Sequence, residues 1–171
     1  MKHVLFALLA IVLMVNFASA QSSEAIAVLA NVGTELLVAA AADLDFTEVA
    51  PGVTYTINTT GLKVPGGPGE GGVNEELAPG QWDIEGTGDA NVAVTFLLSD
   101  RLIGDGGGTI GVSYTGQSGG WNNAQDPSAT QLLFDPRVGT TLQLSDDGLA
   151  SVFLGAVITV PMGAPAGAYT G

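Results

Sequence analysis

Two pairs of acidic residues are the side chains of this sequence best spaced for acid–base chemistry. The pairs are Asp43 with Asp45 and Asp83 with Glu85. On an extended strand, residues two positions apart point to the same side. Glycoside hydrolysis needs two carboxyl groups about 5 to 10 Å apart, one of them in an apolar pocket. These acids alternate with large apolar residues, namely Leu44, Phe46, Trp82 and Ile84. The alternation predicts solvent-facing carboxylates and no catalytic pair.

The sequence has almost none of the side chains that usually serve nucleophilic catalysis and metal binding. The sequence has no cysteine, and its one histidine, His3, lies in a segment that we expect to be removed. This excludes Ser-His-Asp and Cys-His catalysis from the remaining chain, together with metal sites built from His or Cys. We therefore predict no enzymatic activity, no catalytic residue and no cofactor.

Calcium binding by loop carboxylates is the one metal site left open. The sequence contains no EF-hand loop pattern. Asp100 with Asp105, or Asp146 with Asp147, would offer a weak site with few ligands. Asp146-Asp147-Gly148 matches a hairpin turn better, because Asp and Gly tolerate the positive φ angles of such turns. We predict no metal site, and calcium binding by these loops stays an open alternative.

An aromatic residue in a polar loop is the best candidate for ligand binding. Trp121 lies in the stretch SGGWNNAQD and is followed by Asn122 and Asn123. An exposed indole beside amide side chains is typical of carbohydrate stacking. The other interpretation, which we favour, is that the indole folds back over the edge of the fold. Under the first interpretation, Trp121, Asn122 and Asn123 are the ligand-binding residues.

The first twenty residues have the pattern of a signal peptide. Lys2 and His3 precede an apolar run over 4–17, and Ala18-Ser19-Ala20 is the small-x-small motif that signal peptidase recognises. We predict cleavage between Ala20 and Gln21. The apolar run is shorter than the roughly 20 residues that span a bilayer. We therefore expect a secreted or cell-surface protein without an integral membrane segment.

Residues 21–171 are predicted to form a single domain. Their number, 151, suits one hydrophobic core, and without cysteine no disulfide supports that core. Three basic residues against 17 acidic ones give this segment a formal net charge of −14. Such a charge repels phosphate backbones and anionic membrane surfaces, which argues against nucleic-acid binding.

Alternating apolar residues indicate that the segments between these side chains are β-strands. Five runs show the two-residue period of half-buried strands, and turn residues such as Pro79-Gly80 separate them. The runs cover 53–58, 81–85, 92–98, 109–115 and 151–160. The last run is apolar on both faces and should therefore lie centrally in a sheet. Residues 22–42 are ambiguous between helix and strand, and we predict strand. The whole pattern predicts an all-β antiparallel sandwich.

Three stretches, taken in order, resemble the motifs of a known family. They are DLDFTEVAPG (43–52), GQWDIEGTGDANVAVTFLLSD (80–100) and DDGLASVFLGAVITVPMGAPAGAYTG (146–171). They are similar to the opening signature, the middle hairpin and the closing motif of the bacterial family called domain of unknown function 4402. Thr47 stands where that family usually has glycine, so the turn there is expected to differ. The resemblance implies a secreted, immunoglobulin-like or pilin-like β-sandwich and implies no established activity.

The resemblance also implies one more strand after Tyr169-Thr170-Gly171, and this sequence does not contain it. A sandwich without its last strand exposes unpaired backbone groups beside an apolar groove. Either the full protein continues beyond Gly171, which we favour, or another subunit fills the gap by strand addition, as in pili. In the second case the donor would be residues 22–38, where Ile26, Val28 and Ala30 alternate.

Together, these features predict a function that involves no catalysis. We expect an exported, non-enzymatic structural or adhesive surface module. It would be a pilin-like subunit if it pairs by strand addition with copies of itself or with a related subunit. The alternative is an extracellular carbohydrate- or ligand-binding β-sandwich that uses Trp121.

Overall fold

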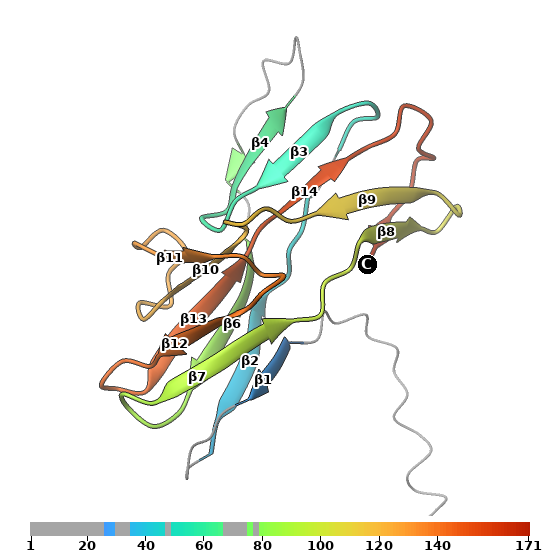
Figure 1. Ribbon diagram of the computed structural model, residues 1–171. Helices are drawn as coiled ribbons and strands as arrows, with labels where there is room; N and C mark the ends of the chain where they lie inside the picture. The colour runs from blue at the N-terminus through green and yellow to red at the C-terminus, as the bar shows by residue number, and fades with distance from the viewer. Residues whose placement is uncertain (1–25, 30–34, 47–48, 67–74, 77–78) are drawn as a thin grey trace, which may run out of the picture.

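The structure, a computed structural model, describes residues 26–29, 35–46, 49–66, 75–76 and 79–171. The predicted signal peptide and its cleavage site at Ala20 and Gln21 lie outside the described residues. The described part of the chain contains β-strands and no helix (Figure 1). The strands are β1 (Ile26–Leu29), β2 (Leu37–Ala42), β3 (Thr54–Ile57), β4 (Leu62–Gly66), β5 (Glu75–Glu76), β6 (Gly80–Glu85), β7 (Asn91–Phe96), β8 (Arg101–Gly104), β9 (Thr109–Ser113), β10 (Gly119–Asn122), β11 (Leu132–Phe134), β12 (Thr140–Gln143), β13 (Leu149–Leu154), β14 (Ala156–Thr159) and β15 (Tyr169–Thr170).

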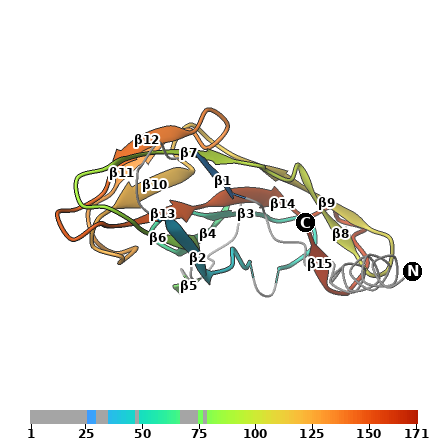
Figure 2. The same ribbon diagram turned by 90° about the horizontal axis from the view of Figure 1, so that it is seen from below.

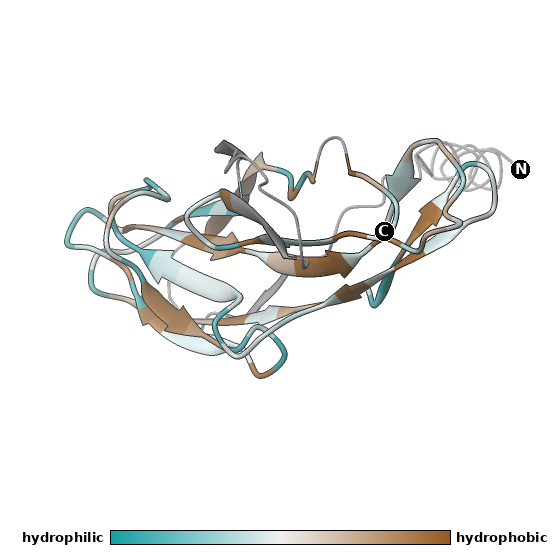
Figure 3. Ribbon diagram, turned by 90° about the horizontal axis from the view of Figure 1, so that it is seen from above, coloured by the Kyte–Doolittle hydropathy of each residue, from teal (hydrophilic) through white to brown (hydrophobic). Residues whose placement is uncertain are grey.

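These strands form three antiparallel sheets, which confirms the predicted all-β sandwich. The first sheet has the strand order β1-β7-β12, and the second has the order β11-β10-β13-β6-β2. The third has the order β15-β8-β9-β14-β3-β4-β5. In Figure 3 the hydrophilic residues gather in the loops, whereas the most hydrophobic residues lie on strands.

The first two sheets face each other and form what we call the closed half of the molecule. Successive side chains of a strand point to opposite faces, so alternate residues of β6, β7, β12 and β13 meet between the two sheets. The residues of this core are at most 1% exposed: Ile84, Val92, Val94, Leu142, Leu144, Ala150 and Val152. At one end, the N–H of Gly86 donates to the carbonyl of Gly148 (2.9 Å), and the N–H of Asp89 donates to that of Ser145 (3.1 Å). The closed half is therefore a complete sandwich.

The seven-stranded sheet forms the open half. One of its faces carries a second buried cluster, made of Phe46, Val53, Tyr55, Ile57, Ile110, Ala156, Ile158 and Val160. Leu44, Phe46 and Val49, from the segment that follows β2, pack over this face. The opposite face is more exposed, and there the hydroxyls of Thr54 and Thr159 are hydrogen-bonded at 3.0 Å. Within the residues that the structure describes, the open half thus has one sheet and a narrow cover instead of two sheets.

One run of chain is central in both halves. β13 lies between β10 and β6, and β14 lies between β9 and β3, which confirms the central position predicted for 151–160. Gly155 separates the two strands, and its N–H donates to the carbonyl of Ser118 (2.8 Å). A Cβ on Gly155 would collide with the carbonyl oxygen of Ile57. Glycine is therefore required where the run passes from one sheet into the next.

Two turns differ from the hairpins expected at these positions. The turn at 86–89 reverses the chain as expected, but β6 lies in the second sheet and β7 in the first. β12 and β13 are divided in the same way across Asp146-Asp147-Gly148, where Gly148 has a φ of 79°. Turn residues specify a reversal of the chain, whereas burial of each apolar face decides which strand pairs with which. Both turns therefore connect opposing sheets.

The ambiguous segment 22–42 supplies two strands within its described residues, as predicted. β1 pairs with β7 in the first sheet, and β2 pairs with β6 in the second. β2 is an edge strand with a bulge between Ala40 and Ala42, and its Leu37 is 57% exposed. The N-terminal strands therefore lie at the edges of the closed half.

Candidate functional site

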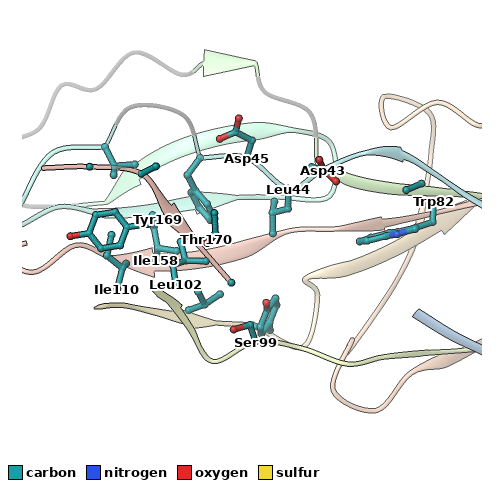
Figure 4. A pocket seen from close by; sticks show the side chains of 18 residues that line it. Asp43, Leu44, Asp45, Trp82, Ser99, Leu102, Ile110, Ile158, Tyr169 and Thr170 are labelled. Carbon is teal, nitrogen blue, oxygen red and sulfur yellow. The ribbon is translucent and has the colours of Figure 1, made fainter. Parts of the chain in front are cut away.

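A groove of about 570 Å³ lies in the open half, between the segment that follows β2 and the inner face of the seven-stranded sheet. Its apolar lining includes Leu44, Phe46, Leu102, Ile110, Val112 and Ile158. Figure 4 shows Leu44, Leu102 and Ile158 gathered around this space. Trp82 lines the groove on the side of the closed half, where its ring meets Phe96 edge-on at 5.8 Å between centroids.

The segment Gly167–Gly171 lines another side of the groove. Here β15 pairs with β8, so that Tyr169 lies opposite Gly104 and Thr170 opposite Ile103. The Tyr169 hydroxyl donates to the carbonyl of Pro165 (2.8 Å). A Cβ on Gly104 would collide with the Tyr169 ring, which shows how closely that ring lies on the strand. This side of the groove is thus built by a strand of two residues.

The backbone beside the groove belongs to one run of chain, in which β7 is followed by β8. A short strand pairs with each of these two strands, on the same side of the run. β15 pairs antiparallel with β8, and β1 pairs antiparallel with β7, where Ile26 lies opposite Phe96 and Leu29 opposite Ala93. In Figure 2, β12 and β9 lie on one side of this run, and β1 and β15 on the other. We call the side that carries β1 and β15, over residues 93–104, the acceptor edge. Residues 97–102 of this edge have no partner in β1 or β15.

Comparison with known proteins places the fold in a family. A family model described as a domain of unknown function (DUF4402) matches residues 36–171. The chain belongs to the DUF4402 family. No curated protein and no solved structure matches the chain. The groove lies within the matched DUF4402 domain, whereas β1 precedes it. In the described part of the chain, no helix is long and apolar enough to cross a membrane.

The two acidic pairs of the DUF4402 domain lie in different places. Asp43 and Asp45 are exposed at the rim of the groove. Asp83 lies on β6, where it accepts hydrogen bonds from the Ser151 hydroxyl (2.5 Å) and from the Gln81 amide (2.9 Å). The neighbouring Glu85 is exposed. The structure therefore holds Asp83 in a polar network on the sheet and does not bring the two pairs together as a catalytic site.

The loop carboxylates considered for calcium are spread over the surface of the DUF4402 domain. Asp100 accepts two hydrogen bonds from the Arg101 guanidinium, the shorter at 2.7 Å, and these bonds hold the pKa of the Asp100 carboxyl below its ordinary value. Asp105, Asp146 and Asp147 are exposed. Among the described residues, no group of three or more acidic or metal-ligating side chains is close enough to hold a metal ion.

The candidate ligand-binding residues lie on β10 and just after it, in the closed half and away from the groove. Trp121 is half-buried and packs against the core of the closed half, opposite Val152 on β13. Asn122 is buried, and its amide donates to the carbonyl of Asp126 (2.8 Å) and accepts from the N–H of Ala124 (3.0 Å). Asn123 is exposed. The Asn122 side chain therefore braces the loop that follows β10.

Sequence reasoning anticipated an apolar groove but not the residues that line it. The alternation along 92–98 continues to Leu102, whose side chain lines the groove. Ser99, Asp100 and Arg101 interrupt the apolar pattern, so the sequence predicts that the run ends at Leu98. The even-numbered positions were the signal that could have extended this strand to the groove.

Proposed function

We propose that this protein is an exported, non-enzymatic structural or adhesive module of the cell surface that assembles by strand addition. The observation that carries the proposal is the groove, whose lining includes several apolar side chains and which lies beside a backbone edge. Among the described residues, β15 and β1 pair with this edge at its two ends. An extended peptide that joins such an edge gains main-chain hydrogen bonds and places alternate side chains in the groove. A pilin-like subunit uses a surface of this kind.

The size of the groove suits a few apolar side chains. Full burial of one side chain of the size of valine or leucine contributes about 1.5–3 kcal/mol. Two or three such side chains, with the hydrogen bonds of the acceptor edge, offset the cost of ordering a donor strand. An apolar groove beside an open edge is also an aggregation hazard, and a partner strand removes that hazard.

Export and the absence of catalysis are supported by the sequence. The signal peptide pattern over residues 1–20 supports secretion, with a mature chain that starts at Gln21. The chain after residue 20 has no histidine or cysteine, and the acids at the rim of the groove are exposed. The carbohydrate-binding alternative has less support, because Trp121 packs on the core and Asn122 is engaged within its own loop.

Assembly of the secreted protein tests this proposal. Leu102 lines the groove, whereas its neighbour Ile103 is 57% exposed and does not line it. We expect the wild-type protein to form oligomers in light scattering, Leu102→Asp to abolish them, and Ile103→Asp to leave them unchanged. Circular dichroism verifies that both variants are folded. A wild-type protein that stays monomeric at all concentrations, or two variants that behave alike, would refute strand addition at the groove.

A further inference from the structure

The N-terminal strand β1 lies outside the DUF4402 domain and yet pairs with it. The family match begins at residue 36, and β1 ends at Leu29. Within the described residues, β1 has one strand partner, β7, at the end of the three-stranded sheet. All four residues of β1 are in register with β7, from Ile26 opposite Phe96 to Leu29 opposite Ala93. A strand from outside the domain therefore completes one of its sheets.

The backbone N–H and C=O groups of β7 that face β1 can be identified from the groups that face β12 on its other side. Along a strand, consecutive residues direct their N–H and C=O groups to opposite sides. The carbonyl of Ala90 accepts from Leu144 N–H on the β12 side (2.9 Å), and Val94 has the same parity as Ala90. Ala93 and Thr95 therefore direct their backbone groups toward β1. In the register shown, β1 is the strand that these backbone groups face.

The connection between β1 and the domain allows β1 to belong to another copy. Seven residues, 30–36, join β1 in the first sheet to β2 in the second. If β1 leaves its own β7, β2 can keep its pairing with β6. The same register then forms against β7 of a second copy, so the exchange makes identical contacts and costs little free energy. Short connections between an exchangeable element and its domain favour such swapping.

We propose that Ile26–Leu29 of one copy of this chain pairs with β7 of a second copy, in the register that β1 shows within one chain. This inference rests on the proposed function and goes beyond it, because it adds a second contact between copies, in which β1 is the donor and residues 93–96 of β7 are the acceptor. β1 and β15 lie on the same edge, one at each end of the stretch 97–102. Exchange of β1 therefore links copies directly beside the groove.

Engineered cysteines test the exchange, since the chain has no cysteine of its own. Ala27 lies opposite Thr95 in the β1–β7 register. We would co-express two differently tagged full-length chains, one carrying Ala27→Cys and the other Thr95→Cys, and oxidise the secreted protein. Pairing of β1 of one chain with β7 of the other brings the two cysteines to the distance that a disulfide requires. We expect a reducible band at the mass of two chains that carries both tags.

A matched control separates exchange from random collision. Thr141 lies on β12, opposite Ala93 on the other side of β7, and it is exposed like Thr95. Co-expression of Ala27→Cys with Thr141→Cys should give no two-tag band. Equal bands from both mixtures would overturn the proposal.

A single chain that carries both cysteines tests the opposite outcome, in which β1 stays paired within its own chain. If β1 stays in its own chain, the Ala27→Cys/Thr95→Cys variant forms only a disulfide-closed monomer, and the two-chain mixture gives no band. That outcome would overturn the exchange of β1. It would leave the proposed function intact if the wild-type protein still forms oligomers that Leu102→Asp abolishes, so the two failures are distinguishable.

Discussion

The two halves of the molecule are built from the same kind of alternating strand but differ in what covers their apolar faces. In the closed half a second sheet covers the first, and every core residue is at most 1% exposed. In the open half the apolar face of the seven-stranded sheet has Leu44, Phe46 and Val49 over it, and a groove of about 570 Å³ remains. The alternation of a strand therefore determines which face is apolar. The completeness of the opposing layer decides whether that face becomes a core or a binding surface.

The largest expected difference concerns two isoleucines that are equally buried. Ile84 lies in the core of the closed half and Ile110 lines the groove, and each is 1% exposed. Ile84→Ala should lower the free energy of unfolding by about 3–5 kcal/mol, and Ile110→Ala by only about 2 kcal/mol, because Ile110 already borders unfilled space. Chemical denaturation measures both. Equal losses would show that the groove is packed like a core and would break the comparison.

A second prediction concerns Trp121, which we assign to the closed half as a packing residue. Trp121→Ala should cost about 3 kcal/mol of unfolding free energy, as expected for the truncation of an aromatic residue packed on a core. The fluorescence of the wild-type protein should not change with a panel of glycans. A glycan-dependent shift that Trp121→Ala abolishes, with little loss of stability, would restore the carbohydrate-binding alternative.

A third prediction addresses the junction of the two halves. Gly155→Ala should destabilise the protein by about 2 kcal/mol, because the added Cβ meets the carbonyl oxygen of Ile57 and the backbone must shift. Gly163→Ala is the control, since a Cβ at that position meets nothing within 4 Å. Thermal unfolding compares the two variants. Equal melting temperatures would show that the junction tolerates a side chain.

The smallest effect concerns the acid dependence of stability. Hydrogen bonds from Arg137 lower the pKa of the Asp135 carboxyl in the closed half, and those from Arg101 lower the pKa of Asp100 in the open half. A carboxyl whose pKa is lower in the folded state adds stability at neutral pH, and this stability is lost as pH falls through its folded pKa, below about 4.

Asp135→Asn and Asp100→Asn should therefore each reduce the loss of stability between pH 7 and pH 3. We expect Asp135→Asn to have the larger effect, because Asp135 also accepts from the backbone N–H of Arg137 (3.0 Å). Denaturation midpoints at the two pH values test this. A steeper acid dependence in either variant would contradict the assignment of these pairs.

The sequence was sufficient to predict the strands β3, β6, β7 and β9 and the run through β13 and β14, with their apolar faces. It was not sufficient to predict the short strands β4, β8, β10, β11 and β12 or the partner of each strand. Val53, Tyr55 and Ile57 are buried as their alternation indicated, and 151–160 is central in its sheets. The partners of β6 and β12 were not predictable, because a Gly- or Asp-containing turn serves a hairpin and a crossing between sheets equally well. An apolar groove beside a strand edge was expected. Its lining was not, because Leu102 follows the polar residues Ser99 to Arg101, which hide the continuing alternation.

The run through β13 and β14 affects how the molecule unfolds. Since this run is central in both the five-stranded and the seven-stranded sheets, neither half can lose its middle strand without disturbing the other. The two halves should therefore unfold in a single cooperative transition. The amides of Val152 and Ile158 should then exchange with deuterium through the same global opening. A strand bound beside Leu102 would slow exchange at Val152 as well, in the half of the molecule that the bound strand does not touch.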